Sequence, residues 1–322
     1  MPNNANKAGK LHMVPKAQLT KELVLRLDRH GQSYLHYAAM EGDLQQIPKQ
    51  LLTIENLLTH NINVETALQI IAQRGHISQL PREVLTEDNL MIKDHSGNTA
   101  MHYVASNGQL QKLPKTAITT RSLLVQNQEG VTPMHNAALA HKLSTIPSSS
   151  ITPETLLIPN CYGITPLHIL AGQGKDNIPT KILISLNWSI ADMDGQTPMH
   201  TATKNGQLPK VPKELLTKEN MSIRDRYGKT PLHWAARCGQ LDHLSTTIIT
   251  QSDLLVEDSA GLSPLHFANI YGHLDQLLGI SLEDTDEIRS IVGDDWFERN
   301  RAVLEAKQIG YNAEQIPDLD IF

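Results

Sequence analysis

The chain has 322 residues, of which 40% are hydrophobic and 4% aromatic, so we expect a core built mostly of Leu, Ile, Val and Ala. Its net charge of −6 arises at the end of the chain, because residues 281–322 hold 11 acidic and 4 basic residues and leave 23 acidic and 24 basic residues in 1–280. A nearly neutral body without a basic stripe argues against nucleic-acid binding, and the lack of any run near ~18 apolar residues argues against a membrane span.

The N-terminus is predicted to be a disordered stretch followed by half of a repeated unit. Residues 1–10 are polar, and the sequence of 14–22 matches that of 47–55, which lies 33 residues further on. Because the match covers only the second half of a unit, we expect residues 11–27 to form a cap that shields the apolar face of the first full unit.

A repeat of about 33 residues organises the chain from there to residue 280. Its clearest copy is DRYGKTPLHWAARCG, residues 225–239, and the His of this block recurs, or is replaced by Gln, at steps of 33, 33, 33, 33, 32, 33 and 33 residues. The positions are His36, Gln69, His102, His135, His168, His200, His233 and His266. A fixed period of this length is typical of a stacked array of small structural units.

Each unit opens with a turn and a short helix. The turn has the pattern Asp-x-x-Gly, in which the Gly provides a positive φ. Thr-Pro follows, and the Thr hydroxyl can cap the free N–H groups of a helix whose first residue is Pro. An Ala pair lets neighbouring helices approach closely. A Gly after the helix is placed like a left-handed C-cap, with His141 in its position in one unit.

The second half of each unit is predicted to be broken rather than one long helix. Pro recurs at positions 48, 81, 114, 147, 179 and 212, Thr follows five residues later in most units, and an acidic residue often stands two residues beyond the Thr. Pro cannot sit inside a continuous helix, whereas Thr and the acidic residue are typical of a helix start. We therefore expect two short helical turns broken at the Pro.

The pattern Asp-x-x-Gly-x-Thr-Pro-Leu-His-x-Ala-Ala-x-x-Gly at this step resembles the ankyrin repeat over about residues 11–280. The resemblance implies an all-α solenoid of about eight 33-residue helix-turn-helix units with hairpin loops and helical caps. It also implies protein binding through an extended concave face, with no reaction common to the family. The second unit departs from the pattern at Val64 and Gln69, and the fifth lacks one residue between His168 and Pro179.

After residue 280 the period stops, and the acidic segment 281–322 is predicted to hold two short helices, one beginning at 281–284 and one from 294 to about 307. One interpretation of this segment is a helical cap in which Trp296 and Phe297 pack against the last repeat. The other is a short acidic and apolar motif at 317–322 that docks on a basic partner or on another copy of the chain.

The in-register histidines do not predict a metal site. Equivalent atoms in neighbouring units lie ~10 Å apart, whereas the ligands of one Zn²⁺ each lie within ~2.1 Å of it. We expect each His to hydrogen-bond to the backbone of a hairpin instead. The sequence also lacks the phosphate-binding loops and nucleophile motifs of common enzyme classes, so we expect no catalytic residue, metal or cofactor.

The two cysteines are expected to be free. Cys161 and Cys238 stand two units apart, roughly 20 Å at ~10 Å for each packed element, which is too far for a disulfide. Cys238 is interpreted as a semi-buried thiol and not as a nucleophile, because no nearby base can be assigned. A reducing cytoplasm is the simplest setting for such a chain.

Two sets of positions vary between units while their surroundings stay fixed: the hairpin tips and the ends of the first helices. In a right-handed stack both sets fall on one long face, and their side chains do not hold the unit together, so they are the candidate protein-binding residues. An ordinary solvated face is the alternative for each. The candidates are Arg29, His30, Met40, Glu41, Arg74, His95, Asn107, Tyr162, Lys204, Asn205, Arg226, Tyr227, Lys229, Arg237, Ile270 and Tyr271. The aromatic residues that directly follow the His position are interpreted as packing between units; they are Tyr37, Tyr103, Trp234 and Phe267.

The predicted function is non-catalytic recognition of another protein, as an adaptor or an inhibitor. The alternative is a structural or regulatory subunit of a larger enzyme assembly, which could self-associate through the acidic tail. The broken outer segments resemble those of ankyrin proteins of bacterial origin, many of which are effectors or parts of interaction systems.

Overall fold

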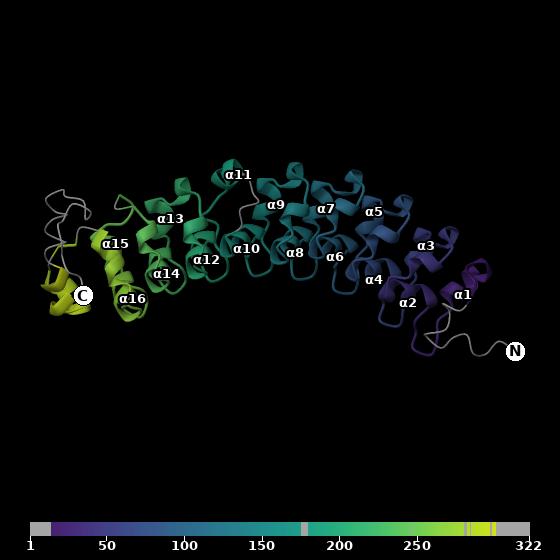
Figure 1. The fold of residues 1–322 in the computed structure, drawn as a ribbon, viewed down its shortest axis with the longest axis horizontal. Helices are drawn as coiled ribbons and strands as arrows, with labels where there is room; N and C mark the ends of the chain where they lie inside the picture. Colours follow the sequence, from purple (N-terminus) through teal and green to yellow (C-terminus); the bar gives the residue numbers. More distant parts are fainter. Residues whose placement is uncertain are drawn as a thin grey trace. The chain divides into compact units, whose positions relative to one another are not determined.

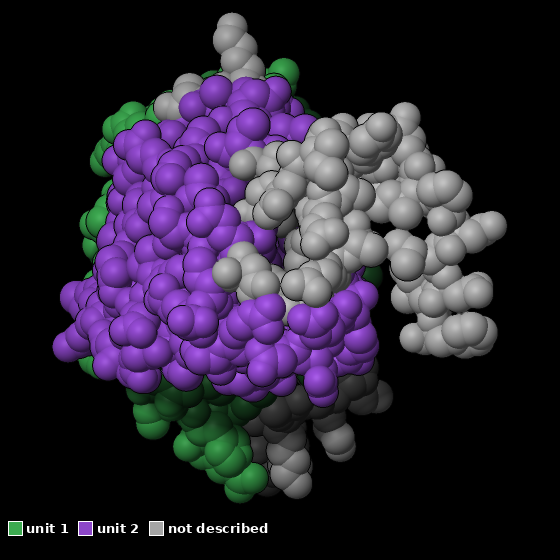
Figure 2. All heavy atoms as spheres, turned by 90° about the vertical axis from the view of Figure 1, so that its left-hand side faces the viewer, with its two compact units in different colours: residues 1–161 green, residues 162–322 purple. Residues whose placement is uncertain are grey.

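The computed structural model describes residues 14–300 except 175–179, 246, 280, 281, 284 and 297. The N-terminal stretch 1–10, Pro179 and the segment 317–322 therefore lie outside the described residues. The chain divides into two compact units, residues 1–161 and 162–322, which are coloured separately in Figure 2. The division falls inside the hairpin of the fifth predicted repeat.

The described residues form short helices and no strand, in agreement with the predicted all-α class. Unit 1 contains α1 (Lys21–Leu25), α2 (Tyr34–Glu41), α3 (Ile54–Leu57), α4 (Ala67–Gln73), α5 (Glu87–Leu90), α6 (Ala100–Ser106), α7 (Thr120–Leu124), α8 (Pro133–Leu139) and α9 (Pro153–Leu157). Unit 2 contains α10 (Pro166–Gln173), α11 (Thr180–Ser185), α12 (Pro198–Lys204), α13 (Lys218–Ser222), α14 (Pro231–Arg237), α15 (Gln251–Leu254), α16 (Pro264–Ile270) and α17 (Asp286–Val292).

The even-numbered helices form an inner row in each unit. Helices α2, α4, α6 and α8 lie side by side in unit 1, as do α10, α12, α14 and α16 in unit 2 (Figure 1). A Ser or Thr caps the start of each of these helices, as the sequence predicts. The left-handed C-cap is confirmed too, with φ of 79° at Gly42 and 58° at His141.

The outer segments are broken at Pro as predicted, but into three pieces rather than two. In the first repeat, 3-10 turns at Leu44–Gln46 and Lys49–Leu51 flank Pro48, and α3 follows Thr53. Pro48 has an extended ψ of 134°, so no helix passes through it. The third piece arises because the backbone extends again at Thr53, whose hydroxyl accepts the N–H of Asn56 and starts a new helix. The same order recurs at Pro81, Pro114, Pro147 and Pro212.

The hairpins are closed by their Asp and stack on one another within a unit. Asp94 Oδ1 accepts the N–H groups of Ser96 at 2.9 Å and Asn98 at 2.8 Å. The N–H of Gln128 in the next hairpin then donates to the carbonyl of Ser96 at 3.1 Å. Gly97 has φ of 77°, and a Cβ there would lie 2.9 Å from the backbone N of Gln128, so both conformation and close approach require glycine.

The core of each unit lies between its inner and outer rows. In unit 1, Leu90, Met101, Leu110 and Leu123 are fully buried, and burial of each such side chain contributes about 1.5 to 3 kcal/mol. The Ala pair of α8 is also fully buried, which allows its neighbour α6 to pack closely.

Both ends of the array are covered by short helices. At the N-terminal end, α1 contacts α2 and buries Val24 completely. At the C-terminal end, α17 contacts α16 and buries Ile288, and Asn269 Nδ2 donates to the carbonyl of Ile291 at 2.6 Å. The helix expected to begin at 281–284 instead begins at Asp286, because Thr285 is the residue that caps it. Trp296 is buried, and Phe297 lies outside the described residues.

Candidate functional site

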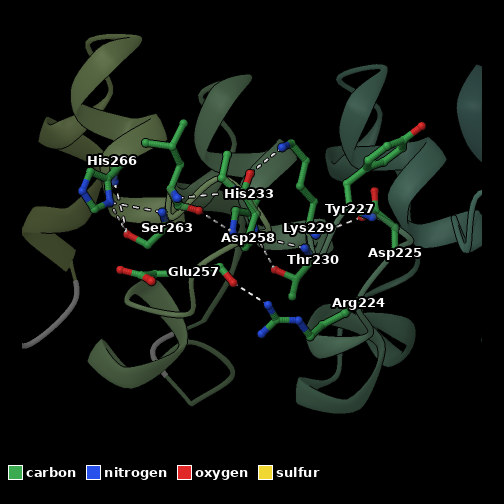
Figure 3. Close-up of polar contacts among 12 residues, drawn as sticks. Arg224, Asp225, Tyr227, Lys229, Thr230, His233, Glu257, Asp258, Ser263 and His266 are labelled. Carbon is green, nitrogen blue, oxygen red and sulfur yellow. Dashed lines mark hydrogen bonds and ion pairs between the residues drawn. The ribbon is translucent and has the colours of Figure 1, made fainter.

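Five of the in-register histidines join their repeat to the next hairpin, as predicted. In unit 2 the N–H of Thr230 donates to His233 Nδ1 at 2.9 Å, and His233 Nε2 lies 3.1 Å from the carbonyl O of Leu262 (Figure 3). Since Nδ1 accepts a backbone N–H, the ring proton is on Nε2 and donates to that carbonyl. The equivalent contacts join His36 to Thr59, His102 to Val131, His168 to Gln196 and His200 to Lys229.

Burial keeps these rings neutral. It lowers the pKa of His102 and of His233 to about 4, although the carbonyl acceptor of each ring acts in the opposite direction. Both nitrogens of each ring are occupied, so neither is available to a metal ion. The described part of the chain holds no group of three His, Cys, Asp or Glu side chains able to bind a metal.

Gln69 takes over the role of His in the second repeat. Its Oε1 accepts both the N–H and the hydroxyl of Thr66 at 2.9 Å, and its Nε2 donates to the carbonyl of Ile92 at 3.4 Å. The amide therefore offers an acceptor to the cap and a donor to the next hairpin, as the neutral imidazole does. These residues are scaffold and carry no chemistry of their own.

Most of the candidate binding residues are exposed. Met40 and Lys229 are half-buried, and the other candidates lie on the surface. At the hairpin tips of unit 2, Tyr162 and Tyr227 are 56% and 53% exposed, and Figure 3 shows the Tyr227 hydroxyl directed away from the polar network around Lys229. Met193, at another tip of this unit, is 69% exposed and was missed; it occupies the position of Arg226 in the next repeat.

Two candidates are engaged inside the array. Lys229 Nζ pairs with the buried carboxylate of Asp258 in the next hairpin (Figure 3). Asn107 Nδ2 donates to the carbonyls of Ala72 at 2.8 Å and Gln73 at 2.9 Å in the preceding helix. Both side chains therefore hold neighbouring repeats together, and we remove them from the candidate surface.

Four side chains from α12, from α14 and from the C-cap of α16 form a row of alternating cations and rings in unit 2. Lys204 Nζ lies 5.1 Å from the centre of the Trp234 ring, and Arg237 Cζ lies 5.4 Å from it. Arg237 Cζ also lies 5.2 Å from the centre of the Tyr271 ring. We call Lys204, Trp234, Arg237 and Tyr271 the cation–aromatic ladder. Trp234, interpreted from the sequence as packing alone, is its central member.

Trp234 also stands at the position where two other repeats use Tyr to complete a hairpin. Tyr37 Oη donates to Asp28 Oδ2 at 2.9 Å, and Tyr103 Oη donates to Asp94 Oδ2 at 2.6 Å. Trp234 follows Asp225 at the same spacing, but its Nε1 and the Oδ2 of Asp225 are both buried without a hydrogen-bond partner among the described residues. This repeat therefore lacks a bond that two other repeats of the chain make.

The cysteines show no sign of activation. Cys161 and Cys238 are both free, as expected, and Cys238 is more exposed than expected. The Cys238 Sγ lies 3.6 Å from the carbonyl O of Lys204, and partial burial raises the pKa of its thiol. A raised thiol pKa disfavours the thiolate that a nucleophile needs.

The paired rows of helices, the capped Thr-Pro starts and the hairpins tied by His define a helical repeat solenoid. The family model for ankyrin repeats (3 copies) matches residues 35–113 and 181–248. The chain therefore contains ankyrin repeats, as the sequence pattern predicts. A search of curated proteins found no match. Ankyrin repeats generally mediate protein–protein interactions, and proteins built from them are typically non-catalytic. None of the described helices has the length and apolar character needed to span a bilayer.

Proposed function

We propose that the chain recognises another protein through the face formed by its hairpin tips and inner-helix ends, the concave face of an ankyrin array. The observation that carries this proposal is that each repeat separates buried scaffold residues from exposed residues that do not hold the repeat together. Most of the cap, His and Ala positions are buried and hold the scaffold, while large side chains are exposed beside them, such as Tyr227, Ile270 and Tyr271. Exposed aromatic residues and Arg are favoured anchors of protein interfaces.

This function needs no chemistry from the chain itself. A protein bound along the face would be recruited if its own active site stayed free, and inhibited if that site were covered. We propose a cytoplasmic setting, which is compatible with two free cysteines.

Site-specific photocrosslinking tests the proposed face. A photoreactive phenylalanine analogue is placed at Met40, Arg74 or Tyr271 on the inner face, one position per variant. It is placed at Lys115 or Lys213, exposed on the outer segments, as the matched control. We expect adducts with the same protein, identified by mass spectrometry from extracts of the source cells, at the inner positions and not at the outer ones. Equal labelling from both sets would contradict the proposal.

A further inference from the structure

The ladder of unit 2 carries positive charge that its surroundings leave uncompensated. Some other cations of this unit have acidic partners, as Lys218 has Asp253 at 3.1 Å and Arg226 has Asp194 at 3.6 Å. Lys204 and Arg237 form no ion pair with any carboxylate of the described residues; their contacts are the faces of aromatic rings. Both side chains are exposed, so their charge faces the solvent.

The rings hold these cations in place before any ligand arrives. Arg237 lies against both Trp234 and Tyr271, which restricts its side chain to few rotamers. A cation–aromatic contact at the surface contributes ~0.5 to 1 kcal/mol but leaves the N–H groups of Arg and Lys free to donate. Ordering the side chains in advance lowers the entropic cost of binding.

The two buried, unpaired polar atoms around Trp234 are a second observation, independent of the contacts between cations and rings. A Tyr there could donate to Asp225 as Tyr37 and Tyr103 donate to their own hairpin Asp. Trp leaves a buried carboxylate oxygen and its own Nε1 unpaired, which is unfavourable for stability. Local rules of stability are typically broken at functional sites.

We propose that the cation–aromatic ladder binds an acidic segment of the protein partner. Carboxylates of that segment would pair with Lys204 and with the fork of Arg237, which matches a carboxylate with two parallel hydrogen bonds. Apolar side chains of the same segment would pack on the Tyr271 ring and on Ile270, which is 63% exposed beside it. This inference rests on the proposed function and adds the chemical class of the ligand.

A peptide selection tests the ladder with a defined probe. A phage-displayed library of random 12-residue peptides is panned against the full chain. The best sequence is then synthesised with a fluorescent label, together with a version in which Asn and Gln replace each Asp and Glu. We expect enrichment of Asp and Glu with apolar residues, binding that weakens as salt is raised, and at least tenfold weaker binding of the neutral version.

Matched charge variants distinguish peptide binding at the ladder from a general attraction of the peptide to positive charge. K204Q/R237Q removes two positive charges from the ladder, and K210Q/K213Q removes two exposed charges from the outer segment of the α12 repeat. We expect the first pair to weaken peptide binding at least tenfold and the second less than twofold. Equal effects of the two pairs would overturn the ladder as the site.

The remaining outcomes distinguish this inference from the function on which it rests. The selection could instead enrich peptides without Asp or Glu whose binding is weakened by Y271A. That result would support recognition by this face and overturn the proposal that the bound segment is acidic. Peptides that bind K204Q/R237Q and Y271A as tightly as the unchanged chain would contradict both the ladder and the proposed binding face. The full-length variant E314Q/D318N/D320N tests whether the acidic tail of the chain itself occupies the ladder. A tenfold gain in peptide affinity would show that the tail competes for the ladder, and it would overturn the proposal that the ligand is a segment of a partner protein.

Discussion

Lys229 of one hairpin pairs with Asp258 of the next, and the Asp258 side chain is 0% exposed while that of Lys229 is 22% exposed (Figure 3). Burial raises the pKa of the Asp258 carboxyl, but the hydrogen bond from Lys229 and the backbone N–H groups of Leu262 and Ala260 outweigh it and hold the pKa below its usual value. The pair is therefore ionised and pins two repeats together.

Removal of Lys229 should destabilise unit 2. In Lys229→Ala the buried carboxylate of Asp258 loses its charged partner, and an unpaired buried charge costs about 3 kcal/mol or more. We expect a lower urea midpoint for K229A than for K213A, which removes an exposed Lys without an ion-pair partner among the described residues. Equal midpoints would mean that the pair contributes nothing to stability.

Trp234→Tyr should stabilise the chain while weakening the proposed binding. The phenol would donate to Asp225 Oδ2, and the unpaired indole N–H would disappear, for a gain of about 1 kcal/mol. Tyr103→Phe is the mirror control, because it removes the existing bond to Asp94 and should cost about 1 kcal/mol. Thermal midpoints of both variants check the argument, and a destabilised W234Y would contradict it.

Stability should fall as the pH drops from 6.5 toward 4. The pKa of His102 and of His233 is about 4 in the folded chain, below the ordinary value of 6.5, so the unfolded chain binds more protons across this window. At pH 5 each His should cost about 2 kcal/mol relative to neutral pH. Urea titrations from pH 7 to 4 measure the slope, and H102Q/H233Q should flatten it, since Gln69 already fills this position without titrating.

The repeated step predicts what is local to a repeat and misses what depends on neighbouring repeats. His233, its Thr cap and the C-cap Gly stand at fixed spacings whose geometry follows from backbone hydrogen bonds alone. Lys229 was assigned to the binding surface because its partner, Asp258, lies 29 residues away and is recognised only from side-chain directions.

Trp234 was assigned to packing for the same reason. It shares its position with Tyr37 and Tyr103, whose hydroxyls close their own hairpins. Only the structure shows that the indole instead faces Lys204 from the preceding repeat.

The break of the period after residue 280 was visible in the sequence. The start of α17 was not, because it depends on which of several polar residues provides the cap, and in the structure that residue is Thr285.

Val64→Gly should stabilise unit 1. Val64 has φ of 62°, a left-handed conformation that costs an L residue about 1 to 2 kcal/mol, and it occupies the hairpin position that Gly97 has in the next repeat. A Cβ at Gly97 would lie 2.9 Å from the backbone of the following hairpin, so the Cβ of Val64 is expected to crowd its own following hairpin. Backbone hydrogen bonds join the other successive hairpins of unit 1, but the described residues show none from the His95 N–H to the Asn63 carbonyl. Val64 therefore both strains its own turn and holds the next hairpin away. Glycine should relieve the strain and let that bond form, raising the thermal midpoint and slowing hydrogen exchange at the His95 amide. An unchanged midpoint with unchanged exchange would show that the turn is not strained.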